Sequence, residues 1–235
     1  MPPTPSEAAR DAFNPYDADQ RRKAINLLSN APFGGEEPYL KAYRLMLTPG
    51  MADEDPTVRA AALRALGRHG LPEDVKLIIP YLSPQQPKFV RLEAATALQR
   101  LHAGQAIDPL IASLRDDEAA EVRIAAADAL AQYPDPRVFQ ALVGALHDTD
   151  YAVVTQAVHS LELLTGRKFG EDGAQWLAWA DQTDQLFAES GEYYYPQYIK
   201  PPSLLDRMQF WKKPKKVEPR QPKGLTSGDG SEPVS

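Results

Sequence analysis

The pattern of small and apolar residues repeats through the middle of the chain with a period of 32 residues. The pairs Val58-Arg59, Val90-Arg91 and Val122-Arg123 follow one another at this spacing. Counting from each valine, the fourth and seventh following residues are alanines and the eighth is a leucine. These offsets lie on one face of an α-helix, and the alanines let a neighbouring helix approach closely. The pattern predicts equivalent amphipathic helices that stack on one another.

Less regular copies extend this register in both directions. A later copy at Val153 has Val154 in place of the arginine, and a weaker early copy begins with Gln20-Arg21. Apolar residues spaced three and four apart predict a second helix in each repeat, over residues 73–82, 105–114 and 136–146. Acidic residues before the valine helices suit helix N-termini, where free backbone N–H groups favour negative charge. We therefore predict an all-α fold, an α-solenoid of about five stacked helical hairpins.

The repeated helix resembles that of a known family. The run from Asp55 to Gly67 is similar to the inner helix of HEAT repeats, closest to the bacterial HEAT_2 and bilin-lyase-type (PBS-lyase) repeats. The resemblance covers roughly residues 15–180 and implies an armadillo-like solenoid. In such families, aspartate and arginine form a structural ladder of ion pairs between neighbouring repeats. The resemblance implies that Arg59, Arg91 and Arg123 belong to this ladder, which ends where Val154 replaces the arginine.

Composition divides the chain into four parts. We expect residues 1–13 to be a flexible N-terminus. Residues 14–188 hold the solenoid and close on a capping helix that carries Trp176 and Trp179 on one face. Residues 189–211 form an aromatic extended segment, which we expect to lie along the solenoid. Residues 212–235 are basic and rich in Pro, Gly and Ser, and we expect them to be disordered.

The charge distribution leaves the role of the tail open. The formal net charge is −6, which argues against a nucleic-acid binder that uses the whole protein. Residues 201–235 carry seven basic and four acidic residues, which leaves −9 for residues 1–200. The tail is either a solvated segment, a segment that folds back on the acidic solenoid, or an attachment to anionic lipid or nucleic acid. The last alternative would use Lys212, Lys213, Lys215 and Lys216.

Catalytic and metal-binding motifs are missing from the sequence. There is no cysteine, which excludes disulfides and thiol chemistry. None of the four histidines, at positions 69, 102, 147 and 159, is followed by glutamate, and there is no Gly-x-Ser-x-Gly motif. We therefore predict no metal, no cofactor and no enzymatic activity. The alternative, by analogy with bilin-lyase proteins, is a cofactor-handling enzyme on the same fold.

The regular positions of the sequence nearly all serve packing, which favours a binding role. We predict a non-catalytic scaffold that binds a protein or peptide on the concave face of the solenoid. Positions five and six after each valine should lie on this face, and they give a mixed, weakly polar strip: Leu63, Arg64, Thr96, Asp128 and His159.

The sequence carries little information on location. It begins without the basic and apolar regions of a signal peptide, and it contains no apolar run of the length that spans a membrane. We therefore expect a cytoplasmic protein. A signal segment encoded upstream would place it in the cell envelope instead.

Overall fold

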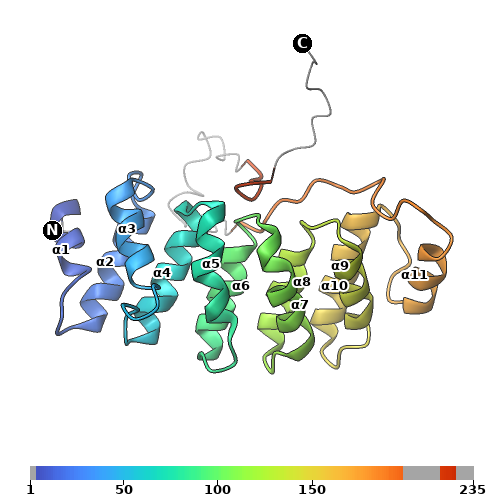
Figure 1. Ribbon diagram of the computed structural model, residues 1–235, viewed down its shortest axis with the longest axis horizontal. Helices are drawn as coiled ribbons and strands as arrows, with labels where there is room; N and C mark the ends of the chain where they lie inside the picture. Colours follow the sequence, from blue (N-terminus) through green and yellow to red (C-terminus); the bar gives the residue numbers. More distant parts are fainter. Residues whose placement is uncertain (1–3, 198–217, 226–235) are drawn as a thin grey trace, which may run out of the picture.

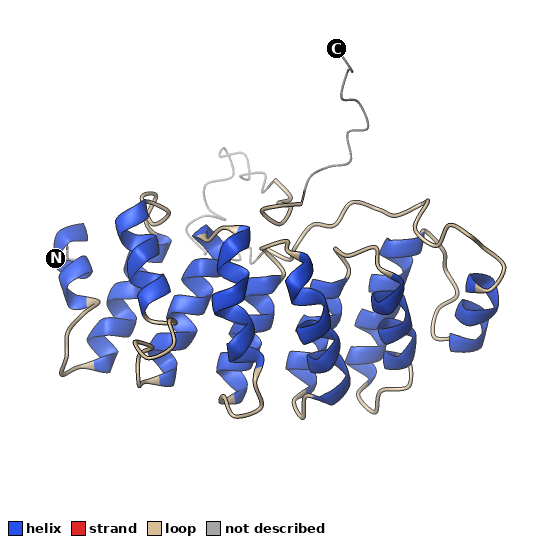
Figure 2. Ribbon diagram, viewed as in Figure 1, coloured by secondary structure: helices blue, strands red, loops and turns tan. Residues whose placement is uncertain are grey.

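The computed structural model describes residues 4–197 and 218–225, and these residues form a row of helices (Figure 1). The described residues contain eleven α-helices and three short 3-10 helices, with no strand (Figure 2). Successive helices stand side by side along the long axis of the molecule (Figure 1). None of the helices in the described part of the chain is both long enough and apolar enough to cross a membrane.

The helices form two layers, and the valine repeats all lie in one of them. In this even-numbered layer each helix contacts the next. Its members are α2 (Ala18–Asn30), α4 (Pro56–His69), α6 (Lys88–Leu98), α8 (Ala120–Leu130) and α10 (Tyr151–Thr165). The odd-numbered layer consists of α1 (Pro5–Asp11), α3 (Glu37–Leu45), α5 (Val75–Ile78) with η2 (Ile79–Leu82), α7 (Ile107–Asp116), α9 (Pro136–Ala145) and α11 (Gly173–Ala180). The short turns η1 (Pro72–Asp74) and η3 (Gly104–Ala106) lead into α5 and α7. The predicted all-α solenoid is confirmed.

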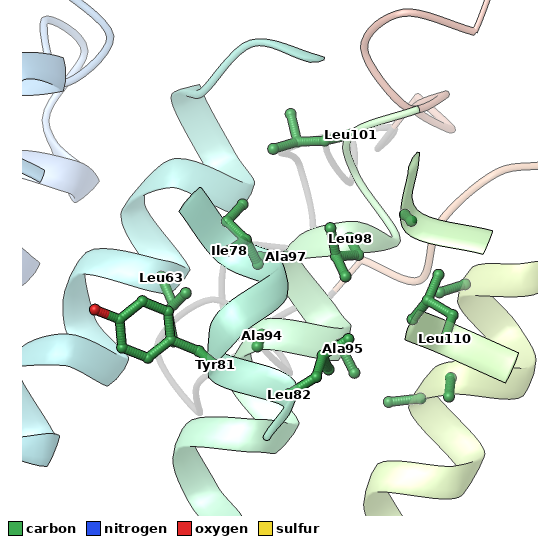
Figure 3. Packing of buried hydrophobic residues seen from close by; sticks show 14 of the residues in the cluster. Leu63, Ile78, Tyr81, Leu82, Ala94, Ala95, Ala97, Leu98, Leu101 and Leu110 are labelled. Carbon is green, nitrogen blue, oxygen red and sulfur yellow. The ribbon is translucent and has the colours of Figure 1, made fainter. Parts of the chain in front are cut away.

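Small residues in the even-numbered layer allow close contact between repeats. The valines that begin the repeats, Val58, Val90, Val122 and Val153, are fully buried. At Gly67 of α4, an added Cβ would lie 2.8 Å from the Cα of Ala97 on α6, so the two backbones nearly touch. Ser160 replaces an alanine in the fourth copy and donates a hydrogen bond of 2.9 Å to the carbonyl of Ala127. Figure 3 shows the resulting core, with Ala94, Ala97 and Leu98 between neighbouring helices.

Acidic residues begin several helices, in agreement with the sequence pattern. The Asp55 carboxylate accepts the N–H of Thr57 at 2.7 Å, and the Asp150 carboxylate accepts the N–H of Ala152 at 2.9 Å. Each bond satisfies a backbone donor that has no partner within its own helix.

The prediction of a flexible N-terminus is wrong for the described residues from Thr4 onward. Residues 5–11 form α1, which starts with a reciprocal capping box between Thr4 and Glu7. Ala8 and Ala12, four residues apart, are buried where α1 contacts α2. A short helix gains its stability from such tertiary contact, so composition alone does not reveal it.

The C-terminal end of the row is closed by α11. Trp176 is fully buried, and its indole N–H donates to the carbonyl of Gly170 at 2.8 Å. Its ring meets Phe169 and Trp179 edge to face, with centroids 4.9 and 6.4 Å away. This aromatic cluster covers the last hairpin, as the spacing of the two tryptophans predicted.

Candidate functional site

The open face of the even-numbered layer carries the residues six positions after each repeat valine. Arg64, Thr96 and Asp128 are partly exposed, and His159 is exposed. They occupy the same position on α4, α6, α8 and α10, so the structure brings four of the five predicted residues onto one face. We call this surface the open face.

The prediction for Leu63 is wrong. Leu63 is fully buried and lies in the core near Tyr81 of η2 (Figure 3). Adjacent residues on an α-helix point about 100° apart, so Leu63 and Arg64 cannot share a face. The fifth position after the valine points toward the packed flank of the helix, where Ala95 and Ala127 are buried as well.

A row of arginine–aspartate pairs joins successive repeats. Arg91 forms two hydrogen bonds to Asp117, of 2.8 and 2.9 Å, and Arg123 forms two to Asp148, of 2.7 and 2.8 Å. Arg21, in the weak early copy, forms the same two-bond pair with Asp53 at 2.7 and 2.8 Å. These guanidinium charges are therefore neutralised within the fold.

Arg59 departs from the expected ladder, because among the described residues it has no carboxylate partner within ion-pair distance. Its Nη1 donates to the carbonyls of Asp53 and Glu54 at 2.8 and 2.9 Å, and its Nη2 donates to the Gln86 side chain at 3.2 Å. The turn before α6 contains Gln85 and Gln86 in place of the aspartate, and the following Pro87 lacks the N–H that such an aspartate would accept.

A second arginine pair, on the odd-numbered layer, escaped the sequence analysis. Arg44 of α3 forms two hydrogen bonds to the buried carboxylate of Asp74, at 2.7 and 3.1 Å. The two residues lie outside the valine repeat, so the periodicity gave no signal for them.

The N-terminal half of the open face is cationic. Arg64 and Arg68 lie one turn apart on α4, and Arg100 is the second residue after the end of α6. Arg64 pairs with Glu93, whereas Arg68 donates to the carbonyl of Ser29 at 3.0 Å and to the Asn30 side chain. Arg68 and Arg100 stand ten residues after the repeat valines. The sequence analysis stopped at the sixth position after each valine, and the tenth position, one helical turn further on, would have revealed both arginines.

A groove with a volume of about 370 Å³ opens across α2, α4 and α6 beside these arginines. Phe89, at its margin, is 42% exposed and offers apolar surface. Three of the lining residues are basic and none is acidic: Arg22, Lys23, Asn26, Thr57, Ala60, Arg64 and Phe89.

The C-terminal half of the open face is built around Asp128. Burial raises the pKa of Asp128 to about 6, against the opposing effects of its hydrogen bond from Tyr193 and of His159. The Tyr193 hydroxyl donates to the Asp128 carboxylate at 3.3 Å, and burial together with this carboxylate raises the pKa of Tyr193. Asp128 and Tyr193 therefore form a partly desolvated polar pair.

Residues 189–197 and 218–225, which we call the strap, lie against the C-terminal ends of the even-numbered helices (Figure 1). The strap begins where the N–H of Gly191 donates to the carbonyl of Leu163 at 2.7 Å. Tyr195 then lies over the guanidinium of Arg100, 5.5 Å from Cζ to the ring centroid, and its N–H donates to the carbonyl of Arg220 at 3.2 Å. The described part of the predicted aromatic segment, residues 189–197, thus runs along the solenoid, whereas residues 198–211 lie outside the described residues.

The second part of the strap corrects the expectation that residues 212–235 are disordered throughout. Lys223 exchanges backbone hydrogen bonds with the chain after α6, to the carbonyl of Arg100 at 2.9 Å and from the N–H of His102 at 2.7 Å. Its ammonium donates to the carbonyls of His69 and Gly70 at 2.7 and 3.0 Å, at the negative end of the α4 dipole. Residues 218–225 therefore fold back on the solenoid. Lys212, Lys213, Lys215 and Lys216 lie outside the described residues.

Two of the four histidines, His69 and His102, make contacts within the fold. His69 contacts the carbonyl of Ser29 at 2.7 Å, and His102 stacks on Tyr133 at 4.6 Å between ring centroids. Burial lowers the pKa of both imidazoles. Within the described residues, no three side chains of the metal-binding types gather where they could hold an ion.

Comparison with known proteins agrees with this architecture. The family model for HEAT repeats matches four overlapping stretches, residues 7–99, 44–131, 75–162 and 107–178. The matches span most of the chain, and the protein belongs to the HEAT-repeat family. The comparison with curated proteins finds no match.

Several solved structures share the fold. A designed armadillo repeat protein in complex with the peptide (KR)4 is similar over 75% of this chain and 87% of its own, at 20% identity and a TM-score of 0.52. An engineered protein matches over 77% of this chain and 92% of its own, at 19% identity and a TM-score of 0.54. The YibA protein of Escherichia coli matches over 76% of this chain and 68% of its own, at 18% identity and a TM-score of 0.51.

Proposed function

We propose that the protein is a non-catalytic scaffold that binds an extended segment of a protein partner on the open face. The observation that carries this proposal is the strap, because the solenoid already holds an extended segment of its own chain beside that face. The segment is held by a side-chain hydrogen bond at Asp128, a cation–π contact at Arg100 and backbone bonds at Lys223.

These contacts are of the kind that a separate peptide can form. The backbone groups inside the helices are paired within each helix, so a ligand meets side chains along the helices and free carbonyls at their ends. Over α2, α4 and α6, the groove in the open face is lined by side chains of this kind, and no residue of the strap lines it. The exposed ring of Phe89 is part of this lining. The designed armadillo protein with its bound (KR)4 peptide supports peptide binding as a use of this architecture.

A site-specific cross-link tests the proposal. A benzoylphenylalanine residue in place of Phe89 puts a photoreactive benzophenone on the open face, where the exposed ring leaves room for the added benzoyl group. The matched control has the same residue in place of Gln140, which is exposed on α9 of the odd-numbered layer. We expect a discrete protein adduct from native cell extract at position 89, absent at position 140 and suppressed by excess unlabelled protein.

Identification of the adduct by mass spectrometry then allows the purified partner to be mixed with the purified protein. Saturable binding of the two, with a cross-link again at position 89, is the expected result. Adducts of equal yield at both positions, or none at position 89, would contradict binding on the open face.

A further inference from the structure

The positive charges of the open face act on one another. Burial lowers the pKa of Arg100, and the nearby charges of Arg68 and Arg64 lower it further, whereas Tyr195 and Glu93 act in the opposite direction. The Nε of Arg100 is buried and has no hydrogen-bond partner among the described residues. Glu93 pairs with Arg64 and also acts on Arg100, whereas Arg68 has no carboxylate within ion-pair distance among the described residues.

This arrangement contrasts with that of the ladder arginines. Arg91 and Arg123 each hold an aspartate through two hydrogen bonds, and their side chains are almost fully buried. The side chain of Arg64 is 41% exposed, and Arg68 is exposed as well. Stacking of the repeats explains the ladder. Arg68 and Arg100, by contrast, have no carboxylate within ion-pair distance among the described residues, and their like charges repel.

The groove next to Arg64 also has more basic than acidic side chains. Arg22, Lys23 and Arg64 line it without an acidic residue, although the chain has 32 acidic and 26 basic residues in total. Asp19 pairs with Arg22 from outside the lining. The ligand that complements this surface carries negative charge.

We propose that the arginine cluster of Arg64, Arg68 and Arg100, together with Lys23, binds an acidic extended segment of the partner protein. This inference rests on the proposed function and names the chemistry of the partner. Neighbouring packed helices lie about 8–10 Å apart, and an extended chain advances about 3.3 Å per residue. Acidic residues about three positions apart would therefore meet Lys23 on α2, Arg64 on α4 and Arg100 after α6. Phe89 offers a contact for an apolar side chain between them.

A peptide segment fits these observations better than nucleic acid does. The net charge of −6 repels a long polyanion outside the cluster, whereas a short segment contacts the cluster alone. Asn26 and Thr57 in the groove add neutral polar side chains that can bond to a peptide backbone.

Fluorescence anisotropy with the full chain tests the inference. The probe is a fluorescein-labelled (Glu-Ser-Gly)4 peptide, which has an acidic residue at every third position. The comparison ligands are (Lys-Ser-Gly)4 and a single-stranded dodecamer of thymidine. We expect saturable binding of the acidic peptide that weakens with salt, and weaker binding of both comparison ligands.

Two double variants locate the site. Arg64→Ala with Arg68→Ala is expected to weaken binding of the acidic peptide by roughly tenfold or more. Arg115→Ala with Arg137→Ala removes the same charge from α7 and α9 and should leave the affinity unchanged. The reversed pair Arg64→Glu with Arg68→Glu should instead gain affinity for the lysine peptide, by more than the pair Arg115→Glu with Arg137→Glu, which has the same net charge.

Other outcomes would overturn the inference. They are absence of acidic-peptide binding, equal losses in the two alanine variants, or tighter binding of the thymidine oligomer. A cross-link at position 89 without binding of the acidic peptide would refute only this inference about the partner's charge. Absence of the cross-link would refute the proposed binding of a partner on the open face.

Discussion

Arg91 and Asp117 join two successive repeats through a pair of parallel hydrogen bonds of 2.8 and 2.9 Å. Their side chains are only 3% and 5% exposed. The same carboxylate accepts the N–H of Ala119 at 2.9 Å, just before α8 begins. One buried aspartate therefore fixes the arginine of one repeat and the helix start of the next, which sets the register between them.

Removal of one partner of this pair should be costly. The substitution Arg91→Ala leaves the Asp117 carboxylate buried without its counter-charge, and we expect the free energy of unfolding to fall by about 3 kcal/mol. The control Arg115→Ala breaks an ion pair with Asp116 in which the arginine side chain is 72% exposed, and it should change stability little because solvent screens the pair. Urea denaturation followed by circular dichroism measures both. Equal losses would show that the buried pair does not hold the repeats.

The incomplete position of the ladder offers a stabilising substitution. Gln86→Glu places a carboxylate where the amide oxygen accepts from Arg59, at 3.2 Å. Because charge-assisted hydrogen bonds are stronger than neutral ones, we expect a gain of about 1 kcal/mol at pH 7. Gln182→Glu, at an exposed position after α11 and away from the ladder, should change stability little. Thermal unfolding of the two variants measures the gain. No increase in stability for Gln86→Glu would contradict a new ion pair with Arg59.

Two glycines should respond to alanine in opposite directions. At Gly67, the new methyl group would meet the Cα of Ala97 at 2.8 Å, and the resulting overpacking should cost about 1–3 kcal/mol. At Gly144 in α9 nothing lies within 4 Å of the added atom, so the lower backbone entropy of alanine should stabilise the fold by about 0.5–1 kcal/mol. Urea midpoints that shift in the same direction would refute the close contact of α4 with α6.

Asp128 should make stability depend on pH. Its pKa is about 6 in the folded chain, above the ordinary value of 3.8, so folding favours the protonated form. The stability from this proton is complete below about pH 4 and is lost as the pH rises to about 6. Asp128→Asn should therefore exceed the wild-type protein in stability at pH 7, by on the order of 2 kcal/mol, and lose that advantage near pH 4.

The control for this titration is Asp184→Asn, at an exposed position outside the open face. It should give a pH profile parallel to that of the wild-type protein. The same parallel profile for Asp128→Asn would mean that Asp128 titrates normally.

Tyr193 and Tyr194 should differ in how strongly they hold the strap against the solenoid. Tyr193 is buried, whereas Tyr194 is exposed. Tyr193→Ala removes the buried ring and its bond to Asp128, so hydrogen exchange at the amides of Gly191 and Tyr195 should accelerate by at least about tenfold. Tyr194→Ala should leave these amides protected, and amides within α8 should be unaffected by either change. Similar exchange in the two variants would show that Tyr193 does not hold the strap.

The sequence by itself determined the helices, their stacking and most of the ladder. Val58, Val90 and Val122 recur with alanines on one helical face, and the geometry of a helix face is a local property that periodicity records. The same register predicted which face carries Arg64, Thr96 and Asp128. The capping box of Thr4 and Glu7 was present in the sequence as well, although composition obscured it.

The tertiary structure alone decided which side chains are covered and which charges meet. Leu63 and Arg64 are neighbours in the sequence, yet only the helices packed around α4 bury one and leave the other accessible. Tyr193 reaches Asp128 across 65 residues, and Lys223 reaches His69 across 154. Contacts at such separations depend on how the whole chain folds back, because no local pattern specifies which distant segment covers a surface. The arginine cluster arises in the same way, from residues of separate repeats that stacking brings together.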